Sequence, residues 1–288
     1  GGGPAEIADR RIECNHRKIQ NWRPFTGRFL IRAYNNTMNL PRFFCPGPLV
    51  AGTVASLPEG AARHAARVLR LVPGDGFVLF DGSGTEYPGR IVAVRKEAVE
   101  AELLAAHLRD AESPLRVTLA QALQAADKMD LTVQKAVELG VTAVQPLASR
   151  RSVVRLDGER AARRVEHWRG VAVSACEQCG RNRVPVVGEI QPLERWLGSL
   201  GPVVPGELRL MMAPGADIAL TALPAPAHVI LLIGAEGGLD PQEMAAAAAA
   251  GFVAVRLGPR VLRTETAGLA ALAAMQVLWG DFKGDDNV

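Results

Sequence analysis

The chain has 288 residues, of which 48% are hydrophobic and 22% are charged, as in a soluble globular protein with room for two domains of ordinary size. The net charge of +3 is unevenly spread: residues 1–38 hold seven Lys or Arg against three Asp or Glu, and the rest of the chain holds 26 against 27. Because the body is nearly neutral, nucleic-acid binding has to depend on local basic patches. No apolar run reaches the ~20 residues that a bilayer requires.

The four cysteines, Cys14, Cys45, Cys176 and Cys179, do not form a disulfide framework in a chain of this length. Cys176 and Cys179 make one CxxC, but no second CxxC or Cys/His pair completes a zinc set. We therefore expect a reduced structural pair and no metal. Free thiols together with many alanines and arginines favour a cytoplasmic protein.

Residues 1–38 lack the apolar segment of a secretory signal, and their three leading glycines are typical of a cloning remnant. We expect this stretch to be an extension with little structure. Ser113-Pro114 interrupts the pattern further on, so the sequence predicts a first domain at 39–111 and a second at 112–288.

In the first domain, a helix is expected at Glu59–Leu71, and Asp81-Gly82 indicates a hairpin turn. Several short strands with one helix are typical of a small β-barrel. His64, Arg67 and Arg70 fall on roughly one side of that helix, where with Arg42 they could form a basic face. An ordinary solvated helix surface would show the same pattern.

The second domain alternates apolar strands with helical stretches, which predicts an α/β fold with a largely parallel sheet covered on both faces. The expected strands are 115–123, 141–148, 208–213, 228–234 and 252–258, and the expected helices are 127–140, 159–176, 241–251 and 268–279. The last helix is apolar on nearly every side, so we expect it to be buried.

Three of these strands end in loops that contain Gly or Pro, namely RLMMAPG, LLIGAEGG and VRLGPRVL. In an open α/β sheet, ligands bind beyond the carboxyl ends of the strands. The GxGxxG spacing and the Walker loop are both absent. The sequence therefore predicts a backbone-lined pocket that suits an uncharged purine nucleoside better than a triphosphate.

The stretch LGPRVLRTETA (Leu257–Ala267) places a dense polar cluster just before the last helix. Thr264 or Thr266 is an expected N-cap, and Glu265 suits the positive end of a helix. A well-capped strand-to-helix corner would explain these residues without a function. Two arginines and a carboxylate at a buried helix are costly unless paired, however, which favours a site.

Together, GAEGG, LGPRVLRTETA, DKMDLTVQKAVELGV and CEQCGRNRVP resemble the RsmE family of SPOUT-class RNA methyltransferases, over about Pro41 to Phe282. The resemblance implies a PUA-like β-barrel followed by an α/β domain with a deep trefoil knot. It also implies a homodimer that uses S-adenosylmethionine and methylates N3 of one uridine in the decoding region of 16S ribosomal RNA.

By the same resemblance, the cofactor pocket draws on the three loops and the start of the last helix. The residues are Met211, Ala213, Gly234, Glu236, Gly237, Gly238, Leu257, Gly258, Val261, Leu262, Thr264, Thr266 and Ala267. One position departs from the family, which usually reads GPEGG where this chain has Ala235. Alanine frees φ there, so we expect a less preorganised loop that still binds the cofactor.

The expected chemistry assigns two catalytic residues. N3 of uracil is a weakly acidic imide that must lose its proton before it attacks a sulfonium methyl group. Arg263 is the candidate for stabilising the developing anion, and Glu265 for taking the proton, unless Glu265 only orients Arg263.

RNA binding is expected from a local excess of charge, since Arg150–Arg183 holds nine arginines against four acids. The candidate RNA-binding residues are Arg42, His64, Arg67, Arg70, Lys128, Arg181, Asn182 and Arg183. Lys128 could instead be an ordinary solvated lysine. Two other functions stay open: a knotted methyltransferase acting on another RNA, such as tRNA, and a ribosome-binding or assembly factor that has lost catalysis.

Overall fold

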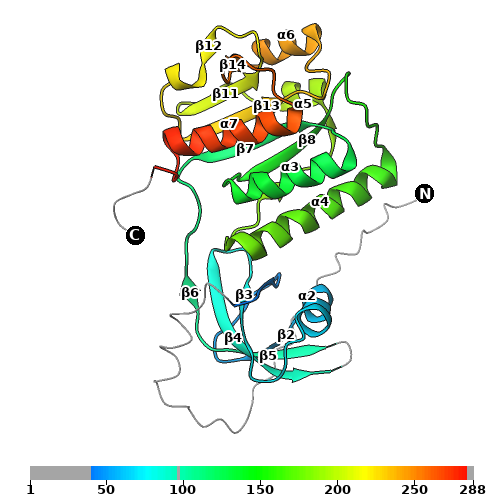
Figure 1. Ribbon diagram of the computed structural model, residues 1–288, viewed down its shortest axis with the longest axis vertical. Coiled ribbons are helices and arrows are strands. Elements are labelled where there is room, and N and C mark those ends of the chain that lie inside the picture. Colours follow the sequence, from blue (N-terminus) through cyan, green and yellow to red (C-terminus); the bar gives the residue numbers. More distant parts are fainter. Residues whose placement is uncertain (1–39, 96–97, 284–288) are drawn as a thin grey trace, which may run out of the picture. The chain divides into compact units, whose positions relative to one another are not determined.

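The computed structural model describes residues 40–95 and 98–283 (Figure 1). They form two compact units: the first ends at Ala111 and also takes in Gly180–Arg183, and the second comprises Glu112–Cys179 and the chain from Val184 onward. We expected Gly180–Arg183 in the second domain, whereas it clusters with the first unit. The extension expected at 1–38 lies outside the described residues.

The first unit is built on a six-stranded sheet in the order β1-β3-β4-β5-β2, with β6 paired to β4. β1 runs parallel to β3, and the other pairs are antiparallel. The strands are β1 (Arg42–Phe44), β2 (Val54–Ser56), β3 (Gly76–Phe80), β4 (Thr85–Val94), β5 (Val99–Leu103) and β6 (His107–Leu108). The predicted turn at Asp81-Gly82 is confirmed, because it joins the antiparallel strands β3 and β4.

The helix of this unit is shorter than expected. α2 (Glu59–Arg63) continues as one π-helical turn, η2 (His64–Val68), and the chain then leaves the helix at Arg70, whose φ of 54° is in the left-handed region. Below it, Phe43, Phe77 and other apolar side chains of the sheet are fully buried. Burial of each side chain of this size stabilises the fold by about 1.5–3 kcal/mol.

The second unit has an eight-stranded sheet in the order β10-β8-β7-β13-β11-β14-β12, with β9 paired to β8, and every pair is parallel. The strands are β7 (Arg116–Ala122), β8 (Ala143–Ala148), β9 (Val186–Val187), β10 (Gln191–Pro192), β11 (Glu207–Met212), β12 (Ile218–Ala219), β13 (His228–Ile233) and β14 (Phe252–Arg256). The predicted parallel α/β sheet is confirmed.

Helices cover both faces of this sheet. They are α3 (Ala126–Glu138), α4 (Gly158–Cys179), α5 (Leu193–Ser199), α6 (Pro241–Ala249) and α7 (Thr264–Trp279), with a short 3-10 turn, η3, at Leu220–Ala222. Figure 1 shows α7, α3 and α4 in front of the sheet, and α3 contacts both of the others. Ile230 and Leu232 point to the opposite face, where they join a core with residues of α5 and α6.

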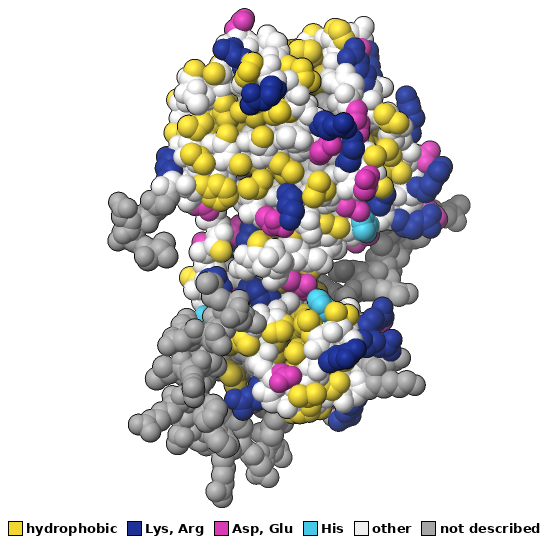
Figure 2. Space-filling model, in the orientation of Figure 1, with side chains coloured by type: hydrophobic (Ala, Val, Ile, Leu, Met, Phe, Trp, Pro, Cys, Tyr) yellow, Lys and Arg dark blue, Asp and Glu magenta, His cyan; other side chains and the backbone are white. Residues whose placement is uncertain are grey.

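The last helix, α7, differs from its prediction. It packs against α3, β7 and β13, so only one side of it is covered, and Val277 on its outer side is 54% exposed. Figure 2 shows hydrophobic side chains gathered on the surface where α7 lies in Figure 1. The expectation of full burial was therefore wrong for this helix. No helix within the described ranges combines the length and the apolar character needed to cross a membrane.

One polar side chain fixes the carboxyl end of α7. Gln276 is fully buried, and its amide accepts a hydrogen bond from Ser113 Oγ at 2.7 Å and donates one to the carbonyl oxygen of Leu139 at 2.9 Å. The amide is thus satisfied on both sides, as a buried polar group must be if it is not to destabilise the fold.

Candidate functional site

The three loops expected to converge do so. β13, β11 and β14 are neighbours in the sheet and run parallel, so their carboxyl ends lie at one edge, and the loops that follow them line one cavity of about 290 Å³. The lining residues are Lys128, Met212, Ala213, Pro214, Ile233, Gly234, Ala235, Glu236, Gly238, Leu239, Leu257, Gly258, Arg260, Val261, Leu262, Arg263, Thr264, Glu265 and Ala267. A cleft of this size, apolar with a few convergent polar groups, is typical of small-molecule sites.

Most of the predicted cofactor residues lie in this lining, and three do not. Met211 is buried in the core, because side chains alternate along β11 and its neighbour Met212 faces the cavity instead. Gly237 contacts the side chain of Arg151, which donates to its carbonyl oxygen at 2.7 Å. Thr266 is exposed on α7.

The sequence also missed several lining residues. Met212, Pro214, Ile233, Ala235, Leu239 and Arg260 all border the cavity without having been assigned to it. Alternation along β11 puts Met211 and Met212 on opposite faces, but the sequence does not show which of the two faces the cavity. Arg260 was visible in the polar cluster, but nothing in the spacing distinguishes an arginine that lines a cavity from one in solvent.

The loop after β13 forms a closed turn, although Ala235 stands where the resemblance implied a proline. Gly238 N donates to the carbonyl oxygen of Ala235 at 2.8 Å, so a tight turn holds the GAEGG segment. Gly234 packs so closely against this turn that a Cβ atom there would lie 2.8 Å from Leu239 N. On the facing loop, Gly258 has a φ of +67°, a conformation that favours glycine.

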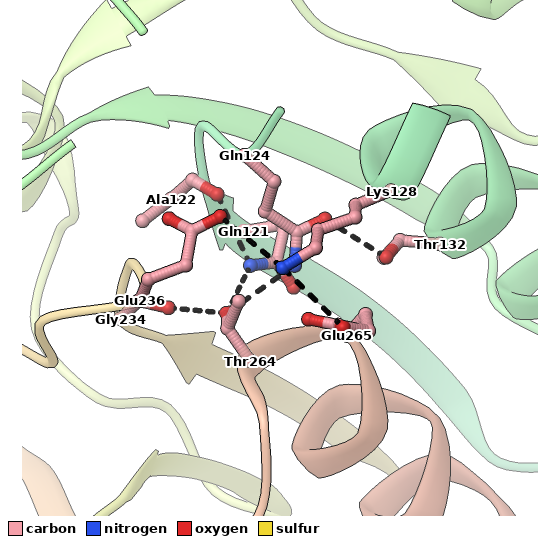
Figure 3. A network of polar contacts seen from close by, with 9 residues as sticks. All are labelled: Gln121, Ala122, Gln124, Lys128, Thr132, Gly234, Glu236, Thr264 and Glu265. Carbon is pink, nitrogen blue, oxygen red and sulfur yellow. Dashed lines mark hydrogen bonds and ion pairs between the residues drawn. The ribbon is translucent and has the colours of Figure 1, made fainter. Parts of the chain in front are cut away.

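Thr264 connects the loops to the neighbouring strand (Figure 3). Its hydroxyl donates to the carbonyl oxygen of Gly234 at 2.5 Å and accepts from Gln121 Nε2 at 3.1 Å and Gln124 Nε2 at 3.2 Å. Gln124 Oε1 in turn accepts from Thr132 on α3 at 2.9 Å. The Thr264 hydroxyl is thus fully used within the protein, so in this arrangement it positions the loop.

Thr264 is also where α7 begins, which corrects the predicted cap. The N-cap is Arg263, and its side chain makes no capping hydrogen bond. Thr264 does not take that role because it is already the first helical residue, and Thr266 lies further inside the helix. Glu265 does lie in the first turn, near the positive end of the helix.

Two carboxylates and one ammonium group meet at the edge of the cavity. Lys128 Nζ lies 3.5 Å from Glu265 Oε1 and 3.8 Å from Glu236 Oε1, and Figure 3 shows the lysine between the two acids. Within the described part of the chain, no ion pair joins Glu265 to Arg263, although both line the cavity. Lys128, which we expected to bind RNA, therefore belongs to this pocket.

Three other candidates for RNA binding have partners inside the protein. Arg42 forms an ion pair with Glu86 at 2.9 Å and donates to the side chain of Asn182, and both Arg42 and Glu86 have almost fully buried side chains. Asn182 is 1% exposed and donates to the carbonyl oxygen of Arg109 at 3.1 Å, and Arg181 is 4% exposed. In this structure these side chains have no open surface to offer a ligand. His64, Arg67, Arg70 and Arg183 are exposed.

Comparison with known proteins identifies the family. The family described as "RNA methyltransferase domain" matches residues 111–276, and the family described as "RNA methyltransferase PUA domain" matches residues 57–104. The ribosomal RNA small subunit methyltransferase E of Mycobacterium bovis is 34% identical over 79% of this chain and 87% of its own length. The chain belongs to this methyltransferase E family. Its first unit is accordingly a PUA-like domain and its second a SPOUT-class methyltransferase fold.

Two further members agree with this assignment. The ribosomal RNA small subunit methyltransferase E of Buchnera aphidicola subsp. Schizaphis graminum is 30% identical over 84% of this chain and 98% of its own length. The crystal structure of the methyltransferase E of Neisseria gonorrhoeae, bound to S-adenosylmethionine, superposes with a TM-score of 0.79 at 43% identity, covering 85% of this chain and all of that one. Threading of α7 through a knot, which the family resemblance implied, stays a prediction.

The hydroxyl of Thr264 generates the first testable prediction. Thr264→Val leaves Gly234 O and the amide of Gln124 without their partner, and an unsatisfied buried polar group costs about 1–3 kcal/mol. We expect urea denaturation to show a loss of stability in that range, with Thr264→Ser close to the original. The matched control is Thr266→Val, at an exposed position two residues along, which should change stability by less than about 0.5 kcal/mol. Equal stabilities for both valine variants would contradict the positioning role.

Proposed function

We propose that this chain transfers a methyl group from S-adenosylmethionine to N3 of one uridine in the decoding region of 16S ribosomal RNA. The observation that carries the proposal is the cavity itself, in which the three loops bring Arg263 and Glu265 beside an apolar, glycine-lined recess. Family membership supports it, since the matching proteins are named as small-subunit ribosomal RNA methyltransferases.

The residues of the cavity fit the cofactor. Leu257, Leu262 and Ile233 offer apolar surface for a flat adenine ring, and the glycine loops leave backbone donors and acceptors within reach. The acidic side chains Glu236 and Glu265 suit a cofactor that carries a sulfonium cation. When bound, S-adenosylmethionine supplies an electrophilic methyl group.

The residues of the chain then have three tasks. The loops hold the reacting groups in line, which is most of what methyl transfer requires. Glu265 accepts the imide proton of the uracil, and Arg263 stabilises the negative charge that develops on the uracil oxygens. Because Glu265 is paired with Lys128 and not with Arg263, the structure favours the role of proton acceptor over that of an orienting group.

The test of this proposal is the reaction itself. Small ribosomal subunits lacking the modification, free 16S RNA and tRNA are incubated with the protein and S-adenosylmethionine, and the product nucleotide is mapped by mass spectrometry. We expect N3-methyluridine at one position of 16S RNA. Methylation of tRNA would favour the alternative substrate, and the absence of any transfer despite RNA binding would favour a non-catalytic ribosome-binding factor.

The cofactor site yields a prediction of its own. In Gly234→Ala the new Cβ atom would lie 2.8 Å from Leu239 N and 2.9 Å from Gly238 C, so the loop must move. We expect the affinity for S-adenosylmethionine, measured by calorimetry, to fall at least tenfold, or about 1.4 kcal/mol. Gly215→Ala is the matched control, because a Cβ atom there meets nothing within 4 Å and Gly215 is not part of the lining. Unchanged affinity in Gly234→Ala would place the cofactor elsewhere.

We further propose that the first unit binds the phosphate backbone of the RNA through exposed arginines. Arg63, Arg67 and Arg95 line a cleft beside α2, where Glu59 pairs with Arg63, and Arg70 is exposed on the same unit. Guanidinium groups bind phosphate well because their donors match its geometry. Exposed His64 and Arg183 belong to the same unit and are proposed to contribute.

This surface can be tested through the salt dependence of RNA binding. Arg67→Gln removes one cation, so the slope of log affinity against log salt concentration should become shallower by about 0.7–0.9. The affinity at fixed salt should fall, while cofactor binding stays unchanged. Arg195→Gln, at an exposed position on α5 of the second unit, is the matched control. Identical slopes for the two variants and the original protein would contradict the assignment.

We also propose a cytoplasmic homodimer. The apolar outer side of α7, with Val277 half exposed, is the surface that a second copy would cover. A mass of twice the chain's 30.7 kDa in light scattering at working concentration is the expected result.

A further inference from the structure

Lys128 occupies a place between two acids that come from distant parts of the chain. It lies in the first turn of α3, Glu236 follows β13, and Glu265 lies in the first turn of α7. The side chains are partly buried, with 28%, 31% and 15% of their surface exposed. At this degree of burial the attraction between opposite charges is stronger than in bulk water. The ammonium group of Lys128 therefore offsets the repulsion between the two carboxylates and lets them lie close together.

The charges of this cluster do not cancel. One ammonium group faces two carboxylates, which leaves one negative charge in excess, and Arg260 and Arg263 are the other charged groups that line the cavity. After Glu265 takes up a proton it is neutral, and Lys128 and Glu236 remain as a balanced pair.

We infer that Lys128 is a positioning residue that acts through Glu265, holding its carboxylate in place and aimed at the uracil until the proton is transferred. This inference rests on the proposed function. In the step concerned, the N3–H bond breaks and the proton goes to Glu265. The electron pair left on N3 forms the bond to the methyl carbon, and the pair of the carbon–sulfur bond stays on sulfur.

The geometry separates this role from RNA binding. A lysine that contacts phosphate points its ammonium group to solvent, whereas Lys128 Nζ lies within 4 Å of both carboxylates. Lys135, two turns along the same helix, shows the ordinary alternative: it is more exposed and pairs with Glu138 on its own helix at 2.8 Å. Lys135 therefore provides a matched control.

The test compares Lys128→Met with Lys135→Met in single-turnover methylation at saturating RNA and cofactor. We expect Lys128→Met to lower the rate about 10- to 100-fold, less than the roughly 100- to 10,000-fold that loss of a general base itself causes. RNA affinity should stay within about twofold of the original, and Lys128→Arg should recover most of the rate. Lys135→Met should react like the original protein. A rate for Lys128→Met equal to that of Lys135→Met would overturn the inference.

A double variant checks that Lys128 acts through Glu265. If it does, Lys128→Met combined with Glu265→Gln is no slower than Glu265→Gln alone. An additive loss, or a tenfold loss of RNA affinity in Lys128→Met, would show instead that the lysine contacts the RNA directly. The proposed function fails separately, if the original protein methylates no uridine at N3. If the original protein is active and Lys128→Met reacts at the same rate, the proposed function stands and only the role of Lys128 is disproved.

Discussion

The arrangement of the site depends on one hydroxyl group, that of Thr264. It joins three parts of the second unit that have no covalent reason to meet: the loop after β13, the end of β7 and the start of α7. Thr264, Glu265 and Ala267 at the start of α7 all line the cavity, and the hydrogen bonds of the Thr264 hydroxyl fix where this end of the helix lies. Arg263 and Glu265 flank Thr264 in the chain, so anchoring Thr264 also fixes where their side chains begin.

The surrounding sheet makes such an anchor necessary. Its strands are buried on both faces and packed by apolar side chains, whose attraction has little directional preference. Apolar packing can hold a helix against a sheet, but it does not define where the helix begins to within a fraction of an ångström. Hydrogen bonds to buried groups do, because leaving one unmade is costly. The polar network in Figure 3 is thus the part of the fold that positions the start of α7 as precisely as a reaction requires.

Much of this could be predicted from the sequence. The strands of the second unit are apolar runs with glycine or proline at their ends, so their existence, their parallel arrangement and the convergence of their loops all followed from local pattern. Short elements such as α5 and β12 were not predicted, because they are too brief to show a period. The one-residue choice between Met211 and Met212 depends on which face of β11 meets the cavity, and an apolar run buried on both faces does not reveal that.

The polar residues were harder to predict, for a different reason. Arg42 and Asn182 look like RNA-binding residues when read as single residues, yet their partners lie far away in the sequence. Lys128 was likewise assigned to a helix surface, since its two acidic partners follow more than a hundred residues later. The sequence around a charged side chain does not show which distant residue it pairs with, so long-range ion pairs are found only in the folded structure.

The buried amide of Gln276 adds a constraint on the whole of α7. Together with Thr264 it pins the helix at both ends, through Ser113 and the carbonyl oxygen of Leu139 at one end and through Gly234 at the other. Between these two pins, exchanges that conserve volume, such as leucine for methionine, cost less than about 1.5 kcal/mol. The number of residues between them is another matter, because one inserted or deleted residue would rotate one pin by about 100° away from its partner. Over evolutionary time the apolar positions of this helix should therefore vary among residues of similar volume, and the spacing between Thr264 and Gln276 should hardly vary at all.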